Sequence, residues 1–93
     1  DLKGLKFRIS GFAGHMFNRL GASATQIPGA DIYPALERGT IDAAEWIGPY
    51  DDEKLGFARV ARFYYAPGFW EGSSRGVFMV NQRAWDALPD QYK

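Results

Sequence analysis

Short segments with the pattern of a strand alternate with segments that have the pattern of a helix along most of this chain. At the start, Leu5, Phe7 and Ile9 alternate with basic residues, which is the two-residue period of a strand. The segment between Gly11 and Gly21 then places its apolar residues at helical spacing, and Gly21 is a typical helix stop. This alternation predicts an α/β fold, with a mainly parallel sheet and helices on its faces.

The same alternation continues to the end of the chain. We expect Asp31 to cap a second helix, with Pro34 in its first turn, where a missing N–H is tolerated, and with Gly39 after its end. Acidic residues suit the start of a short third helix because that end of the helix dipole is positive. Asn81 is expected to cap the closing helix. The pattern places the third helix at 50–57 and predicts extended or strand segments at 25–27, 41–47, 60–65 and 76–80.

Three loops form the region where such a fold is expected to bind a ligand. Ligands of parallel α/β sheets gather at the carboxyl ends of the strands, which here are the loops after Ile9, after Glu45 and after Tyr65. The third loop carries Phe69 and Trp70 beside glycine and proline residues. Aromatic side chains in this setting either pack in the core or form the wall of a small-ligand pocket, and both interpretations stay open.

The composition excludes several classes of partner and site. Eleven basic and eleven acidic residues cancel, and no basic run is present, so neither nucleic acid nor an anionic membrane is an expected partner. The absence of cysteine excludes disulfides and thiolate metal sites. No apolar run approaches the roughly 20 residues that span a membrane. With 93 residues, the chain suits one small domain of modest buried area.

Both ends of the chain have the features expected where a longer protein has been truncated. It begins at Asp1 without a methionine, carries no signal peptide, and stops just after Pro89–Tyr92, which has the pattern of the opening turn of another helix. We therefore expect the chain to be an excised or processed piece of a longer protein.

Several blocks of the sequence resemble the solute-binding subunits of TRAP (tripartite ATP-independent periplasmic) transporters. The opening block, residues 1–9, reads DLKGLKFRI and is similar to a strand of those subunits. The middle block, residues 31–46, reads DIYPALERGTIDAAEW, and residues 48–56 continue it with GPYDDEKLG. Together with PGFWEG at 67–72, the middle block resembles the branch of the family that binds 2-oxo acids and related hydroxy acids. The likeness covers essentially all 93 residues.

The resemblance implies a parent protein with two lobes. Members of this family are type II-like periplasmic binding proteins whose two α/β lobes close around the ligand. Residues 1–93 would form most of the second lobe, and the first lobe and the C-terminal helices would be absent. The parent would lie in the periplasm, capture a small 2-oxo or 2-hydroxy acid, and deliver it to the TRAP membrane subunits. Whether the parent is a homodimer stays open, because the dimer contacts of the family use the C-terminal helices.

Arg8 is the residue expected to bind the carboxylate of the acid. In an arbitrary sequence, an arginine opposite the apolar face of a strand is most often solvated. Its planar guanidinium can instead bind a carboxylate through two parallel hydrogen bonds. The arginine that binds the ligand carboxylate in the family occupies the matching strand position, so the resemblance implies a substrate-binding role for Arg8. Trp46 is implied as a second substrate-binding residue.

The resemblance also implies a cation site at Glu45 and Trp46, which follow the strand after Gly39. In the 2-oxo-acid-binding branch, a cation and the substrate meet at this position. A sodium or calcium ion takes oxygen ligands, which the Glu45 carboxylate, the Trp46 backbone carbonyl and two oxygens of the acid would supply. Glu71, in a glycine-flanked loop, is the third expected metal ligand. Without the resemblance, these residues would be interpreted as surface carboxylates and a packed ring.

An enzyme is the competing hypothesis. A pair of carboxylates, Glu45 with Glu71 or with Asp42, would act as acid and base if their surroundings separated their pKa values. The sequence offers no cysteine nucleophile, no Ser–His arrangement, no glycine-rich phosphate motif and no histidine cluster that would support catalysis. We therefore expect a binding protein that is not an enzyme, and no residue is assigned a catalytic role.

Overall fold

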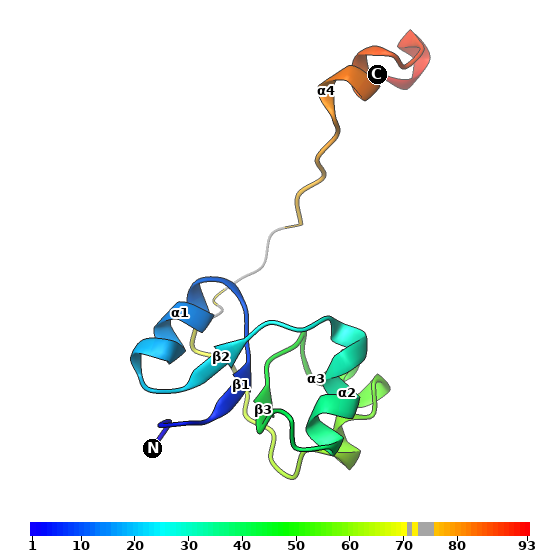
Figure 1. Cartoon of the computed structure of the whole chain (residues 1–93). Helices are drawn as coiled ribbons and strands as arrows, with labels where there is room; N and C mark the ends of the chain where they lie inside the picture. Colours follow the sequence, from blue (N-terminus) through cyan, green and yellow to red (C-terminus); the bar gives the residue numbers. More distant parts are fainter. Residues whose placement is uncertain (71, 73–75) are drawn as a thin grey trace.

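The computed structural model describes residues 1–70, 72 and 76–93, and its central feature is a three-stranded parallel sheet (Figure 1). In the register of the sheet, Phe7 lies beside Ala24 on one side and Ala43 on the other. Arg8, the next residue, points to the opposite face because side chains alternate along a strand. The strands, in the order β2-β1-β3, are β1 (Lys6–Arg8), β2 (Ser23–Thr25) and β3 (Ala43–Ala44).

Helices connect the strands in sequence. α1 (Gly11–Arg19) joins β1 to β2, α2 (Gly29–Glu37) joins β2 to β3, and α3 (Pro49–Lys54) follows β3. Parallel neighbours require such crossover connections, so the predicted α/β class is confirmed. The remaining described elements are the 3-10 turn η1 (Phe57–Arg59), α4 (Gln82–Asp86) and the 3-10 turn η2 (Asp90–Tyr92).

The first hydrophobic cluster packs α1 against one face of the sheet. Phe7 and Ile9 are buried there together with Phe17 of α1, and Trp70 packs against them. The Phe7 and Phe17 rings meet edge to face with centroids 4.9 Å apart, and Trp70 meets Phe17 in the same way at 5.2 Å. Phe7 and Ile9 are therefore buried on the face that their alternation predicted, and Leu5 is partly buried beside them.

The second hydrophobic cluster lies on the opposite face, where it packs α2 and η1 against β3. Its centre is Ile32 of α2, which is fully buried at 0% exposure. Ala44, the neighbour of Arg8 in the sheet register, packs against this cluster and so marks the face on which Arg8 lies. The other buried members are Ala35, Ile41 and Phe57.

The start of α2 differs from the prediction. The helix begins at Gly29 with Pro28 in the N-cap position, so Asp31 is the third helical residue and not the cap. Pro34 consequently lies in the second turn, where it has no N–H to donate to the carbonyl of Ala30. The predicted helix ends are confirmed, since Gly21 and Gly39 follow α1 and α2 with left-handed φ angles of 97° and 67°.

The predicted strands differ more from the structure than the helices do. β3 covers two residues instead of 41–47, and β2 begins two residues earlier than the extended segment expected at 25–27. Residues 60–65 form no strand, because the chain turns at Val60 after η1 and meets no sheet edge in the described part of the chain. The predicted helix at 50–57 is split into α3 and η1. A strand requires a neighbouring strand to pair with, and an apolar pattern in the sequence does not show whether such a neighbour exists.

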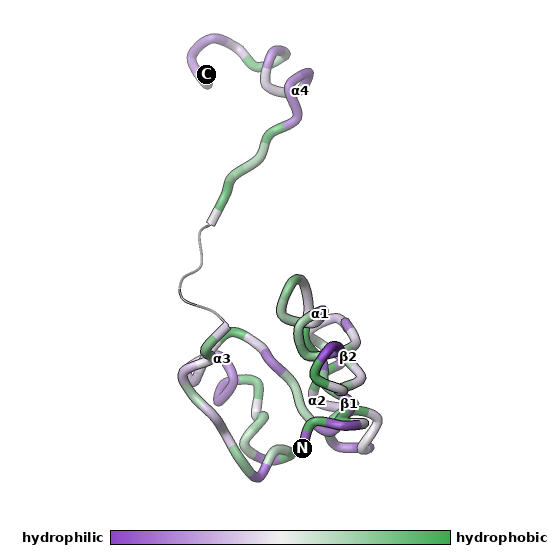
Figure 2. The backbone as a smooth tube through the Cα atoms, turned by 90° about the vertical axis from the view of Figure 1, so that its left-hand side faces the viewer, coloured by the Kyte–Doolittle hydropathy of each residue, from purple (hydrophilic) through white to green (hydrophobic). Residues whose placement is uncertain are grey.

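Residues 76–93 extend away from the rest of the chain (Figures 1 and 2). Residues 76–80 are extended and apolar, but they pair with no strand in the described chain. Asn81 caps α4 as predicted, since its side-chain oxygen accepts hydrogen bonds from the backbone N–H groups of Arg83 (3.0 Å) and Ala84 (3.3 Å). No helix among the described residues is long and apolar enough to cross a membrane.

Candidate functional site

An open cleft lies at the carboxyl ends of β1 and β3. Its volume is about 320 Å³, and it is lined by residues 9–13, Glu45 and Trp70. The residues after β1 and after β3 therefore meet at one place, as expected for a parallel sheet. Trp70 lines the cleft and also packs on the core, so its position is compatible with both interpretations that the sequence left open.

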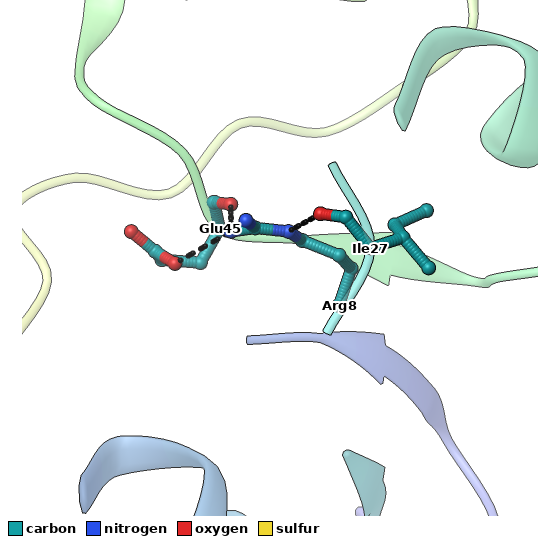
Figure 3. A network of polar contacts seen from close by, with 3 residues as sticks. All are labelled: Arg8, Ile27 and Glu45. Carbon is teal, nitrogen blue, oxygen red and sulfur yellow. Dashed lines mark hydrogen bonds and ion pairs between the residues drawn. The ribbon is translucent and has the colours of Figure 1, made fainter. Parts of the chain in front are cut away.

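Arg8 is the last residue of β1 and is buried, with 6% of its surface exposed. Its Nε donates a hydrogen bond to the backbone oxygen of Ile27 at 3.1 Å. Its Nη1 donates to the backbone oxygen of Glu45 at 2.9 Å and pairs with Oε2 of the same residue at 3.2 Å (Figure 3). The alternative of a solvated strand arginine is therefore wrong.

The surroundings of Arg8 explain how a charged side chain is accommodated in the central strand. A buried charge is costly unless an opposite charge and hydrogen bonds compensate for it. The Glu45 side chain provides the opposite charge and is itself only 16% exposed. The backbone oxygens of Ile27 and Glu45 accept two further hydrogen bonds. These contacts come from two loops that follow neighbouring strands, so the sheet topology sets the position of the guanidinium.

Trp46 completes the group around Arg8. The Arg8 guanidinium carbon lies 5.0 Å from the centroid of the Trp46 ring, within the range of a cation–π contact. The indole Nε1 is buried and has no hydrogen-bond partner in the described part of the chain. Glu45 lines the cleft, whereas Arg8 and Trp46 do not. The structure thus brings together three of the four expected site residues, with Glu45 between Arg8 and the cleft.

The donors around Glu45 fit part of a site for a hard cation. A carboxylate and an adjacent backbone carbonyl are oxygen ligands of the kind that sodium and calcium take. The described residues contain no group of three or more acidic or histidine side chains that could hold a metal ion. Glu71, the further expected ligand, lies outside the described residues. An ion at Glu45 would therefore need additional oxygens from Glu71, the bound acid or the rest of the parent protein.

Asp42, the alternative partner of Glu45 in a catalytic pair, lies at the other end of β3. Its Oδ2 accepts a hydrogen bond from the backbone N–H of Lys6 at 2.9 Å, and its Oδ1 lies 3.6 Å from the Lys6 Nζ. Because β3 separates Asp42 from Glu45, the two carboxylates face opposite ends of the sheet. The structure therefore does not bring this pair together for acid–base catalysis.

The sequence did not reveal the contact between Asp52 and Tyr64. Both Asp51 and Asp52 lie at the start of α3, as expected, but Asp52 is buried with 7% of its surface exposed. Its Oδ2 accepts a hydrogen bond of 2.8 Å from the Tyr64 hydroxyl. Partial burial, this hydrogen bond and the charge of Asp52 together raise the pKa of Tyr64 to about 12. No local signal predicts a contact between a helix and a loop that follows it.

A parallel sheet with a cleft at the carboxyl ends of its strands has the usual place for a ligand in an α/β protein. The chain belongs to the family of bacterial extracellular solute-binding proteins, family 7, whose family model matches residues 1–93. It is 55% identical over all 93 residues to a monocarboxylate 2-oxoacid-binding periplasmic protein of Nostoc sp.. The chain covers 26% of the length of that relative.

Solved structures of TRAP solute-binding proteins have the same fold over nearly the whole chain. One, from Bordetella bronchiseptica RB50, is a mixed-occupancy dimer with copurified calcium and picolinate in one active site; it is 59% identical, with a TM-score of 0.87 over 99% of this chain. Another, from Pseudoalteromonas atlantica T6c, holds sodium and pyruvate and is 55% identical, with a TM-score of 0.89 over 98% of this chain. The chain spans 27% of each of these structures, so it corresponds to one part of a two-lobe binding protein.

Proposed function

We propose that this chain is the acid-binding part of the solute-binding subunit of a TRAP transporter. The parent protein would capture a small 2-oxo or 2-hydroxy acid in the periplasm, with a bound cation, and deliver it to the membrane subunits without catalysing a reaction. The observation that carries the proposal is the buried guanidinium of Arg8, which two loops hold beside the cleft. Membership of the solute-binding family supports it.

The acid would bind Arg8 through the side of the guanidinium that the protein does not use. Nε and Nη1 donate to Ile27 and Glu45, whereas Nη2 donates to no oxygen among the described residues. A carboxylate would accept a hydrogen bond from Nη2 and a second from Nη1 after the Glu45 carboxylate moves aside. Such a paired arrangement is stronger and more specific than a single contact. Trp46, which lies against the same guanidinium, would support it from the side.

A bound cation would favour the replacement of the Glu45 carboxylate by the acid at Arg8. Glu45 lines the cleft, and its carboxylate, once displaced from Arg8, would repel the negative charge of the acid. The Glu45 carboxylate and the Trp46 backbone carbonyl, with Glu71, would hold a sodium or calcium ion whose charge offsets this repulsion. The relatives that hold calcium with picolinate and sodium with pyruvate support this assignment.

The rest of the parent would close the site. We propose that residues 1–93 form most of the second lobe and that a first lobe, absent from this chain, covers the open side of the cleft. The coverage of about a quarter of each relative supports such an arrangement. A homodimeric parent would match the Bordetella relative, which is a dimer.

Calorimetric titration of the full-length protein tests the function. We expect pyruvate to bind with micromolar affinity, which corresponds to about 8 kcal/mol, when calcium or sodium is present. Acetate lacks the 2-oxo oxygen that would contact the cation, and so it serves as the matched control and should bind about 100-fold more weakly. The absence of heat with every 2-oxo and 2-hydroxy acid tested would refute the proposal. Consumption of pyruvate, followed by proton NMR, would favour the carboxylate-pair enzyme instead.

A further inference from the structure

Gly29, the first residue of α2, lies against the ring of Trp46. A Cβ atom at this position would be 2.4 Å from Cη2 and 2.6 Å from Cζ2 of the indole. Such distances are not compatible with a side chain unless the ring moves. The backbone of Gly29 does not have a left-handed φ, so its conformation does not require glycine. The need for space beside the Trp46 ring is therefore the physical reason for a glycine here.

The Trp46 ring is held by packing contacts and not by a hydrogen bond among the described residues. Its Nε1 is buried and has no hydrogen-bond partner among the described residues. The ring contacts Gly29 and also lies 5.0 Å from the guanidinium carbon of Arg8. A displacement of the ring away from Gly29 would therefore change the support of Arg8.

The segment Ile27–Gly29 consequently acts on Arg8 in two ways. The backbone oxygen of Ile27 accepts the hydrogen bond from Arg8 Nε at 3.1 Å. Two residues later, Gly29 leaves room for the ring that packs against the same guanidinium. Trp46 in turn follows Glu45, which accepts the hydrogen bond from Nη1. The orientation of the guanidinium thus depends on how closely the start of α2 approaches the residues after β3.

We propose that Gly29 is a positioning residue of the acid-binding site. Its missing side chain allows the Trp46 ring to pack beneath Arg8 and so orients the guanidinium toward the acid. This inference rests on the proposed function, because it concerns affinity for the acid. Gly29 does not touch the ligand; it acts through Trp46.

Substitutions in the full-length protein separate this role from a general effect on folding. Gly29→Ala should weaken pyruvate binding roughly tenfold or more, because hydrogen bonds weaken steeply when donor and acceptor are misaligned. A role in helix stability alone predicts the opposite sign, since alanine is the better helix former. Trp46→Phe removes the ring atoms nearest to Gly29, so Gly29→Ala should have no further effect on affinity in the Trp46→Phe background. Gly48→Ala is the matched control, because a Cβ there meets nothing within 4 Å and the backbone is extended, with φ 163°.

Two readouts accompany the affinities. Thermal unfolding shows whether each variant folds, and the NMR signal of the Arg8 Nε–H reports the guanidinium position without ligand. Gly29→Ala should shift this signal, and the shift should disappear in the Trp46→Phe background. Wild-type affinity and an unshifted signal in Gly29→Ala would overturn the inference, as would an equal loss of affinity in both backgrounds. If Gly29→Ala does not fold, the double variant must fold and bind like Trp46→Phe, or the inference fails. A wild-type protein that binds no acid would refute the proposed function, and the NMR signal would still decide the role of Gly29.

Discussion

The body of the chain, residues 1–70, and the segment 76–93 have sequence patterns of the same kinds, but only the body is packed. In the body, Phe7 and Ile32 are the centres of two clusters on opposite faces of the sheet. In the segment, every residue is exposed, and Phe78 and Met79 reach 95% and 87% exposure. The apolar segment at 76–80 therefore has the composition of a buried strand without a partner in the described chain.

The difference shows which structural signals are local. Asn81 caps α4 although the segment is unpacked, because the cap needs only the N–H groups of the next turn. Residues 76–80 form no strand because a strand needs the edge of another strand. We expect the remaining part of the parent protein to supply that edge.

The largest expected effect is the loss of ligand binding in the isolated 93-residue chain. An acid in the open cleft keeps its contact with water on the uncovered side, so its pairing with Arg8 should contribute far less than the roughly 8 kcal/mol of micromolar binding. Titration of pyruvate with cation into the chain and into the full-length protein measures the difference. The uncovered apolar surface should also make the chain self-associate, which ultracentrifugation would detect. A micromolar dissociation constant for the isolated chain would show that the body carries the whole site.

Alanine substitutions should reveal the contrast between the two regions directly. Ile32→Ala in the isolated chain should lower the free energy of unfolding by about 2–5 kcal/mol, since it empties a fully buried site. Phe78→Ala should leave it unchanged there, but should destabilise the full-length protein by about 3–5 kcal/mol if Phe78 is buried in the parent. Urea denaturation measures both. Equal effects of Phe78→Ala in the two proteins would contradict a packed role for the segment.

Within the body, Arg8→Lys tests whether the guanidinium binds the acid. A lysine is a point charge that cannot replace the contacts of Arg8 to both loops and still pair with a carboxylate. Affinity of the full-length protein for pyruvate should fall by roughly 1.5–3 kcal/mol, the range for a hydrogen bond to a charged group. Calorimetry gives the affinity, and a parallel unfolding curve identifies any loss that comes from misfolding. Unchanged affinity would show that Arg8 does not bind the carboxylate of the acid through paired hydrogen bonds.

Glu45→Gln tests the cation at the same site. The substitution keeps the size of the side chain and removes its charge, so the full-length protein should bind pyruvate roughly tenfold more weakly, or about 1.4 kcal/mol, at saturating calcium. The response to added cation should also become flatter. Asp42→Asn removes a carboxylate at the opposite end of β3 and should leave the response unchanged. Equal wild-type binding after chelation and in sodium-free buffer would argue against an ion.

The smallest expected effect concerns the contact between Tyr64 and Asp52 in the body. The pKa of Tyr64 is raised to about 12, so its neutral form is favoured in the folded state. The stabilisation should be fully present below the ordinary tyrosine pKa near 10 and should be lost as the pH rises toward 12. Because Tyr64 is 55% exposed, we expect about 1 kcal/mol or less. The stability difference between wild type and Tyr64→Phe should shrink from pH 8 to pH 11.5; a constant difference would contradict a stabilising contact between Tyr64 and Asp52.

Several helix boundaries could be predicted because they depend on a few neighbouring residues. The residues of the site were predicted from the family resemblance. Gly21, Gly39 and Asn81 end or begin helices through contacts with the adjacent turn. The resemblance to the TRAP solute-binding family pointed to Arg8, Glu45 and Trp46, and the structure brings them together. Their roles toward an acid and a cation stay predictions, as does the role of Glu71.

The sequence by itself determined the α/β alternation, the helix ends and the residue types from which an acid site can be built. Only the tertiary structure decided which predicted strands pair, that Arg8 is buried, and that Gly29 makes room for Trp46. Helix caps depend on atoms within a few residues, so the local sequence specifies them. Arg8 instead bonds to residues 19 and 37 positions away, and such contacts depend on the order of the strands, which no local pattern encodes.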